Sequence, residues 1–376
     1  MKEIFTALKQ FFRSLDLFLV LTVLACCGIG LLMQYSFYAT GERDSRAFLV
    51  QVIGVAGGLV LAMVISIFDY ELLARMWKLY APIIVLLVVI TYSPSIGYAP
   101  NPDAPTDHAW LNLGFTTFQP SELMKVAFIL TFAYHLSKVG EHINELRPFL
   151  LLCVHGMIPV VLVVIQSDFG TALVFLIIFA VMMFSAGLSL RWIAVGVGSA
   201  AAAFPFVWIF LLDDFLKERF LVAWHPENYI RGKGYQQYRG RMALGAGQMY
   251  GRGLRSGELI FVPEARNDFI FSYIGQTLGF VGCVITLLLL TCLCVRILVN
   301  ARMSKDQLGC YICIGAFAMF AFQAVINIGM VLCAIPVIGI TLPFFSSGGT
   351  SVMISFAAVG LVLSVYRKNR RKLMFD

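Results

Sequence analysis

The chain has 376 residues, of which 60% are hydrophobic and 13% are charged, and its mean hydropathy is +0.85. A soluble domain carries about 25% charged residues, so this composition excludes an ordinary soluble fold. The net charge of +7 sits mostly in short loops and tails, which indicates membrane orientation and not nucleic-acid binding.

The apolar runs reach the roughly 20 residues that cross a bilayer as a helix, whereas membrane barrels show alternating segments of ~10 residues. The first run follows a basic N-terminus and is longer than the apolar part of a signal peptide, so we expect it to remain as a span. We therefore expect an all-α polytopic membrane protein, a single integral domain over 1–376, with ten spans at 16–38, 48–68, 73–93, 119–137, 148–165, 169–188, 191–212, 269–297, 307–333 and 348–366.

Lys and Arg gather in alternate segments between these spans. One side holds Lys2, Lys9, Arg13, Arg75, Lys78, Lys138, Arg147, Arg191, Arg296, Arg302, Lys305, Arg367, Lys368, Arg370, Arg371 and Lys372. The short segments on the other side hold only Arg43 and Arg46. Cytoplasmic loops carry the excess of cations, so we expect both termini in the cytoplasm, with RKNRRK at 367–372 as a topology anchor or a contact to anionic lipid.

Three segments on the outer side are the expected location of any chemistry. They are 94–118, the long extracytoplasmic loop 213–268 between the seventh and eighth spans, and 335–350, whose prolines and glycines interrupt helix geometry. Non-helical backbone at membrane depth is tolerated only where protein or water covers it.

Charged residues also lie at the outer ends of two predicted spans, the fourth and the sixth. Glu122 and Lys125 are three residues apart in the fourth span, so they share a helix face. They form either a substrate-lining or proton-relay pair, or a structural ion pair between helices. Asp168, in QSDFGT, either caps the following helix or contacts a substrate.

The long loop is basic and rich in glycine between 228 and 257. Among its cations are Arg239, Arg241 and Arg252, and this stretch contains no acid. Glycine lets backbone amides approach a ligand, and cations neutralise phosphate, so the pattern favours a pocket for a phosphorylated, lipid-linked anion over a loop lying on headgroups. At the end of the loop, Asp268 is either a general base beside this pocket or an N-cap of the eighth span, which Asn267 could also supply.

With these segments in order, the chain resembles the SEDS family of peptidoglycan glycosyltransferases, which comprises FtsW, RodA and SpoVE. The resemblance covers almost the whole chain and is carried by five segments: WLNLGFTTFQPSELMK (110–125), QSDFGTALV (166–174), GYQQYRGRMALGAGQMYGRG (234–253), VPEARNDFIFSYIGQTLGFVG (262–282) and PVIGITLPFFSSGGTS (336–351). It departs from the family pattern at Ala109, where a cation is usual, and at Gln276, where the pattern is acidic.

The resemblance implies an enzyme of the bacterial cytoplasmic membrane that polymerises lipid II at the outer face, with inversion at the anomeric carbon. Asp268 matches the family's catalytic acidic residue, which would accept the proton of the attacking hydroxyl. Substrate contacts are implied for Trp110, Glu122, Lys125, Asp168, Arg239, Arg241, Arg252, Ser346 and Ser347. A divalent cation, Mg²⁺ or Mn²⁺, is a candidate for the leaving diphosphate, with its ligands undetermined and no organic cofactor expected.

The family further implies a partner, a class B penicillin-binding protein that acts as the transpeptidase, together with contact to membrane lipids. The PVIG form before TLP resembles RodA, the elongation type, and FtsW, the division type, stays open. The alternatives to an enzyme are a transporter or flippase of a lipid-linked precursor, and a non-catalytic scaffold of a cell-wall complex. A transporter would concentrate its polar groups near the membrane midplane.

Overall fold

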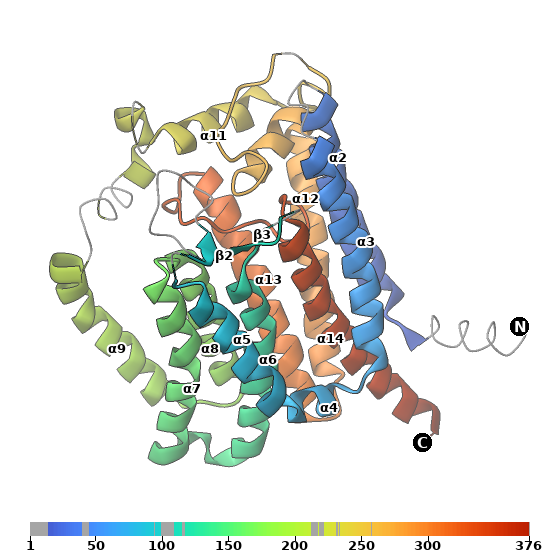
Figure 1. The fold of residues 1–376 in the computed structure, drawn as a ribbon, viewed down its shortest axis with the longest axis vertical. Helices are drawn as coiled ribbons and strands as arrows, with labels where there is room; N and C mark the ends of the chain where they lie inside the picture. The colour runs from blue at the N-terminus through green and yellow to red at the C-terminus, as the bar shows by residue number, and fades with distance from the viewer. Residues whose placement is uncertain are drawn as a thin grey trace, which may run out of the picture.

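The computed structural model describes residues 14–39, 45–93, 95–98, 109–114, 117–211, 217, 222–230, 232, 234–256 and 258–375. Within them the chain is almost entirely helical (Figure 1). Four cations used in the predicted orientation lie outside the described residues: Lys2, Lys9, Arg13 and Arg43.

Each of the ten expected spans coincides with a helix. These helices are α2 (Leu17–Ala39), α3 (Ser45–Ile67), α5 (Trp77–Ile90), α6 (Pro120–Val139), α7 (Leu146–Ile165), α8 (Phe169–Ser185), α9 (Leu190–Phe206), α12 (Ile270–Arg302), α13 (Gln307–Val331) and α14 (Gly349–Phe375). In the described part, seven are long and apolar enough to cross a membrane. Helices α5 and α8 are shorter, and α6 carries charges, so the total of ten spans stays a prediction.

Shorter elements join these helices. They are α4 (Tyr70–Arg75), the 3₁₀ helices η1 (Gly140–Asn144) and η3 (Pro226–Tyr229), the π-helical η2 (Val207–Leu211), α11 (Tyr235–Ala246), and an antiparallel sheet of β1 (Gly97–Tyr98), β2 (Trp110–Asn112) and β3 (Thr117–Phe118). Leu111 pairs with Gly97 on one side and with Phe118 on the other. We call the end with α11 and residues 332–348 the loop end, and the opposite end the α4 end (Figure 1).

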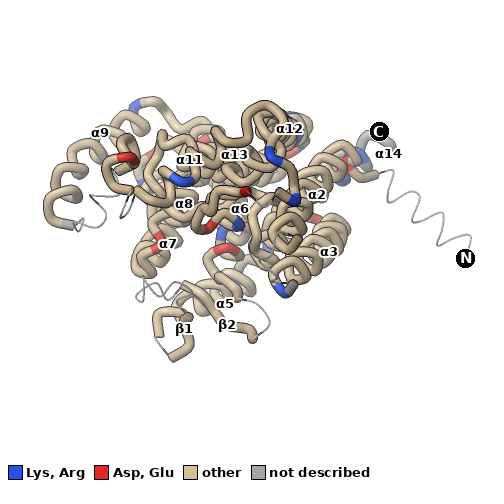
Figure 2. The backbone as a smooth tube through the Cα atoms, turned by 90° about the horizontal axis from the view of Figure 1, so that it is seen from above, with Lys and Arg blue, Asp and Glu red and all other residues tan. Residues whose placement is uncertain are grey.

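The centre of the bundle is formed by α13 and α14, while α9 lies apart at its edge (Figures 1 and 2). Helices α3 and α14 approach closely because small residues face each other. A Cβ on Gly54 would lie 2.6 Å from the Gly349 Cα, and one on Gly360 would lie 2.9 Å from the Ala62 Cα. Small residues that allow backbone contact are typical of helix pairs in membranes.

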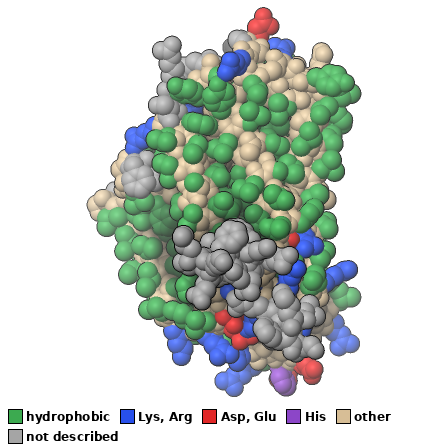
Figure 3. Space-filling view, turned by 90° about the vertical axis from the view of Figure 1, so that its right-hand side faces the viewer, with side chains coloured by type: hydrophobic (Ala, Val, Ile, Leu, Met, Phe, Trp, Pro, Cys, Tyr) green, Lys and Arg blue, Asp and Glu red, His purple; other side chains and the backbone are tan. Residues whose placement is uncertain are grey.

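A band of apolar side chains covers the middle of the molecule, and Lys and Arg gather at the α4 end (Figure 3). This distribution agrees with the predicted separation of cations. The tail at 367–372, predicted as a topology anchor or a lipid contact, is in part bound within the protein. Arg367 is only 6% exposed and donates from Nη1 to the Ser66 carbonyl (2.8 Å), so this cation fastens α14 to the end of α3.

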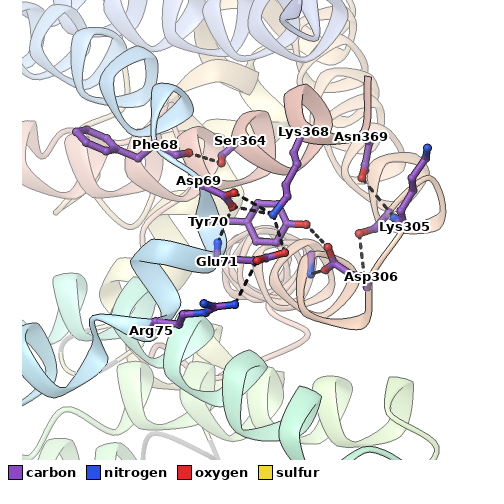
Figure 4. A network of polar contacts seen from close by, with 12 residues as sticks. Phe68, Asp69, Tyr70, Glu71, Arg75, Lys305, Asp306, Ser364, Lys368 and Asn369 are labelled. Atoms are coloured by element: carbon purple, nitrogen blue, oxygen red, sulfur yellow. Dashed lines mark hydrogen bonds and ion pairs between the residues drawn. The ribbon is translucent and has the colours of Figure 1, made fainter. Parts of the chain in front are cut away.

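A polar network at the α4 end continues this fastening (Figure 4). Lys368 of α14 lies 2.9 Å from Asp69 Oδ2 and 2.6 Å from Glu71 Oε1, and Tyr70 donates to the carboxylate of Asp306. Asp306 also caps α13 by accepting from Gly309 N (2.7 Å). The network therefore joins α4, α13 and α14. Asn369 of α14 also takes part, because its Oδ1 accepts from Lys305 N (3.3 Å), so Arg367, Lys368 and Asn369 of the tail are bound within the protein.

Candidate functional site

The ion pair of the fourth predicted span exists and is buried. Lys125 Nζ lies 2.7 Å from Glu122 Oε1, and the two side chains are 2% and 12% exposed. The second oxygen of Glu122 accepts from Ser351 Oγ of α14 at 3.3 Å. Both residues belong to the first turns of α6, where Pro120 fits the helix start. The pair thus lies toward the loop end and ties α6 to α14.

Asp168 is the N-cap of α8, which confirms the first of its two predicted roles, a helix cap or a substrate contact. Its Oδ1 accepts from Thr171 N (2.9 Å), and its Oδ2 accepts from Gln119 Nε2 (2.8 Å). Burial raises the pKa of this carboxyl, Glu122 raises it further, and Lys125 lowers it. Asp168 therefore lies within electrostatic reach of the ion pair.

Asp268 stands in the turn directly before α12. The N-cap position of α12 is Phe269, and it carries no side-chain cap bond, so the alternative role of Asp268 as a cap is wrong. Asn267 does not cap either, since its Nδ2 donates to Glu264 Oε2 (2.7 Å). The Asp268 carboxyl faces the 332–348 segment, where a Cβ added to Gly339 would lie 3.7 Å from Oδ2.

Burial and two acids act on the ionisation of this carboxyl. Burial raises the pKa of Asp268 to about 7, with Glu264 and then Asp168 adding to the increase. A carboxylate with a pKa near neutral pH is suited to take a proton as a general base. Asp168 thus connects the two parts of the site, because it acts on Asp268 and is itself acted on by Glu122 and Lys125.

Two of the three loop arginines that were predicted to bind a phosphorylated anion bind backbone carbonyls of the loop instead. Arg239 donates from Nε to the Phe261 carbonyl (2.8 Å), and Arg252 donates to the Ala246 (3.2 Å) and Glu258 (2.8 Å) carbonyls. These bonds hold the loop to itself. Arg241 of α11 is exposed. The charges that act on Asp268 are the acids Glu264 and Asp168, so the structure does not place the arginines directly beside the base.

The loop glycines also serve packing. Backbone amides of Arg252 and Gly253 donate to the Gln276 (2.9 Å) and Thr277 (3.0 Å) carbonyls of α12. Gly251 has φ +80°, and a Cβ there would lie 2.2 Å from the Thr277 carbonyl oxygen. Gly251 therefore serves close contact with α12, which is kinked at Gly279 (φ +70°). A Cβ on Gly245 or Gly253 would meet no atom within 4 Å, so the anion cradle stays a prediction.

The three remaining predicted contacts lie at the loop end. Trp110 is half-buried in β2, opposite Tyr98. Ser346 is 3% exposed, and its hydroxyl donates to the Asn267 carbonyl (2.6 Å) and accepts from Leu342 N (2.8 Å). The Ser347 amide donates to the Arg266 carbonyl (2.7 Å). The Ser346 side chain and the Ser347 backbone therefore bind the turn that carries Asp268, and the substrate contacts expected of the two serines stay predictions.

A small cavity of about 10 Å³, with room for about one water, is lined by Ser346 and Ser347 and by Ser351, whose hydroxyl also binds Glu122. Its polar lining includes Gln323, Ser346 and Ser351. In the part of the chain that the structure describes, no group of three His, Cys, Asp or Glu residues is placed to hold a metal ion. Each Asp168 oxygen already accepts a protein hydrogen bond.

Sequence reasoning missed three buried amides that hold this end together. Gln119 binds Asp168, Asn327 donates to the Asp268 (2.8 Å) and Ile340 (2.7 Å) carbonyls, and Gln51 contacts the Ser346 carbonyl. Buried polar groups are usually hydrogen-bonded. A Gln or Asn within or beside an apolar run of the sequence could therefore have indicated a buried hydrogen bond between elements.

Comparisons with known proteins agree with this architecture. The sequence model of the FtsW, RodA and SpoVE family, described as cell cycle protein, matches residues 16–371. The chain is 34% identical to the probable peptidoglycan glycosyltransferase FtsW of Trichlorobacter lovleyi, with 93% of this chain and 92% of the relative covered. It is 31% identical to the peptidoglycan glycosyltransferase MrdB of Escherichia coli K12, with 85% of each covered.

The fold matches a solved chain of a peptidoglycan synthase complex that coordinates polymerization and crosslinking. The TM-score is 0.80 at 28% identity, over 94% of this chain and 98% of that one. The similar identities to FtsW and MrdB do not separate the division type from the elongation type.

Proposed function

The chain belongs to the FtsW, RodA and SpoVE family of multi-pass membrane proteins, and we propose that it is a peptidoglycan glycosyltransferase that polymerises lipid II with Asp268 as the general base. The observation that carries the assignment is the Asp268 carboxyl, held at the loop end with its pKa raised to about 7. An ordinary surface Asp has a pKa near 4 and is a much weaker base.

The ionised Asp268 accepts the proton of the acceptor sugar hydroxyl as that oxygen forms a bond to the anomeric carbon of the donor glycan. The bond from this carbon to the lipid diphosphate breaks in the same displacement, so the configuration inverts. Asp168 and Glu264 keep the Asp268 pKa high and make proton uptake favourable near neutral pH.

We infer that the loop end faces the outside of the cytoplasmic membrane. The cations at the α4 end support this orientation (Figure 3). The polar groups Glu122, Asp168 and Asp268 lie toward one end and not at the middle of the bundle, which argues against a transporter. Because the matched solved chain comes from a synthase complex, we also propose a class B penicillin-binding protein as the partner.

The test is polymerisation of lipid II by the purified protein, with and without the co-expressed transpeptidase and with and without divalent cation. Asp268→Asn is expected to lose glycan synthesis while its unfolding temperature stays near that of the wild type. Glu258→Gln is the control, because it removes an exposed acid of the same outer segment and keeps the base. Full activity of Asp268→Asn would refute the assignment.

A further inference from the structure

Three consecutive backbone carbonyls in the turn before α12 accept hydrogen bonds from distant parts of the chain. We call these bonds the carbonyl clamp: Ser347 N to the Arg266 carbonyl (2.7 Å), Ser346 Oγ to the Asn267 carbonyl (2.6 Å) and Asn327 Nδ2 to the Asp268 carbonyl (2.8 Å). The clamp holds the peptide segment on which the Asp268 side chain stands.

The two clamp side chains are buried, and each makes a further hydrogen bond within the protein. Ser346 is 3% exposed, and its hydroxyl also accepts from Leu342 N (2.8 Å). Asn327 is fully buried, and its Nδ2 also donates to the Ile340 carbonyl (2.7 Å). Both of these further bonds run to the 332–348 segment, so one set of side chains fixes that segment and the Asp268 turn relative to each other.

Two helices anchor the clamp. Asn327 belongs to α13, and Gln51 of α3 holds the other side: its Nε2 donates to the Ser346 carbonyl (3.1 Å), and its Oε1 accepts from Gly348 N (3.0 Å). Gln51 is 1% exposed. Groups supported by buried helices are held more accurately than groups on free loops.

We propose that Ser346 and Asn327 are positioning residues that aim the Asp268 carboxyl at the acceptor hydroxyl. The inference rests on the proposed function and gives the serine motif a role other than substrate contact. Displacing a reacting group by about 1 Å can lower a rate by about a hundredfold, so losing one clamp bond is expected to act on the chemical step and not on lipid II binding.

The chain offers matched controls for both clamp side chains. Ser364 is also 3% exposed and donates to a carbonyl, that of Phe68 (2.7 Å), at the α4 end. Asn300 is also fully buried and donates from Nδ2 to Asp16 Oδ2 (2.8 Å). Ser346→Ala is therefore compared with Ser364→Ala, and Asn327→Leu with Asn300→Leu, in lipid II polymerisation and in thermal unfolding.

The clamp variants are expected to lose about tenfold to a hundredfold in kcat with KM for lipid II unchanged, while the controls keep the wild-type kcat. Ser346→Thr keeps the hydroxyl and is expected to recover most of the rate. Wild-type kcat in Ser346→Ala and Asn327→Leu, or an equal loss in the controls, would overturn the clamp alone. An inactive wild type would overturn the proposed function and the clamp with it.

Discussion

Removing Lys125 should strand a buried carboxylate. Lys125 is 2% exposed, and its ammonium is 2.7 Å from Glu122 Oε1, while Ser351 supplies only a hydroxyl at 3.3 Å to the other oxygen. Breaking a buried ion pair by deleting one partner costs about 3–5 kcal/mol, because the remaining charge is left without compensation. Lys125→Met should therefore lower the free energy of unfolding by about this amount.

A double variant distinguishes the cost of an unpaired buried charge from the cost of lost side-chain packing. Replacing a whole buried pair by neutral groups of similar size is often close to neutral, so Lys125→Met with Glu122→Gln should regain most of the stability. Denaturant unfolding in detergent measures the difference, and Lys138→Ala, an exposed lysine of the same helix, is the control. A Lys125→Met protein as stable as the Lys138→Ala control, or a double variant less stable than the single one, would refute this reasoning.

Three further variants test the environment of the site. Glu264→Gln removes an acid that raises the pKa of Asp268 from its ordinary value, so the rise of polymerisation activity with pH, set by ionisation of Asp268 near pH 7, should move to lower pH in a pH–rate profile. Gly251→Ala should cost about 1–3 kcal/mol in unfolding measurements, since it has φ +80° and faces backbone, whereas Gly245→Ala, which faces open space, should be tolerated. Asp168→Ala removes the α8 cap and should cost about 0.5–2 kcal/mol in the same assay, more than Asp168→Asn, which retains a cap oxygen.

The helices could be predicted from the sequence because the bilayer imposes one length on apolar runs. The runs at 16–38 and 307–333 became α2 and α13 within a few residues. The long outer segment was predicted as a polar loop, but it contains α11, whose boundaries no apolar periodicity indicated. Local pattern is a weak guide where packing against another element, here α12, decides the structure.

The part of the site that depends on local sequence could also be predicted. Spacing on one helix determines the Glu122–Lys125 contact, and a helix start determines the Asp168 cap. The role of Arg239 depends instead on which carbonyl the loop presents to it, the one of Phe261. That partner is set by tertiary folding, which the count of cations in a loop cannot reveal.

The acidic surroundings of Asp268 also constrain where the leaving group can bind. Glu264 and Asp168 make Asp268 a stronger base, but the same negative charges repel a diphosphate. In a single displacement the nucleophile and the leaving group lie on opposite sides of the anomeric carbon, so the base and the diphosphate need not share one environment.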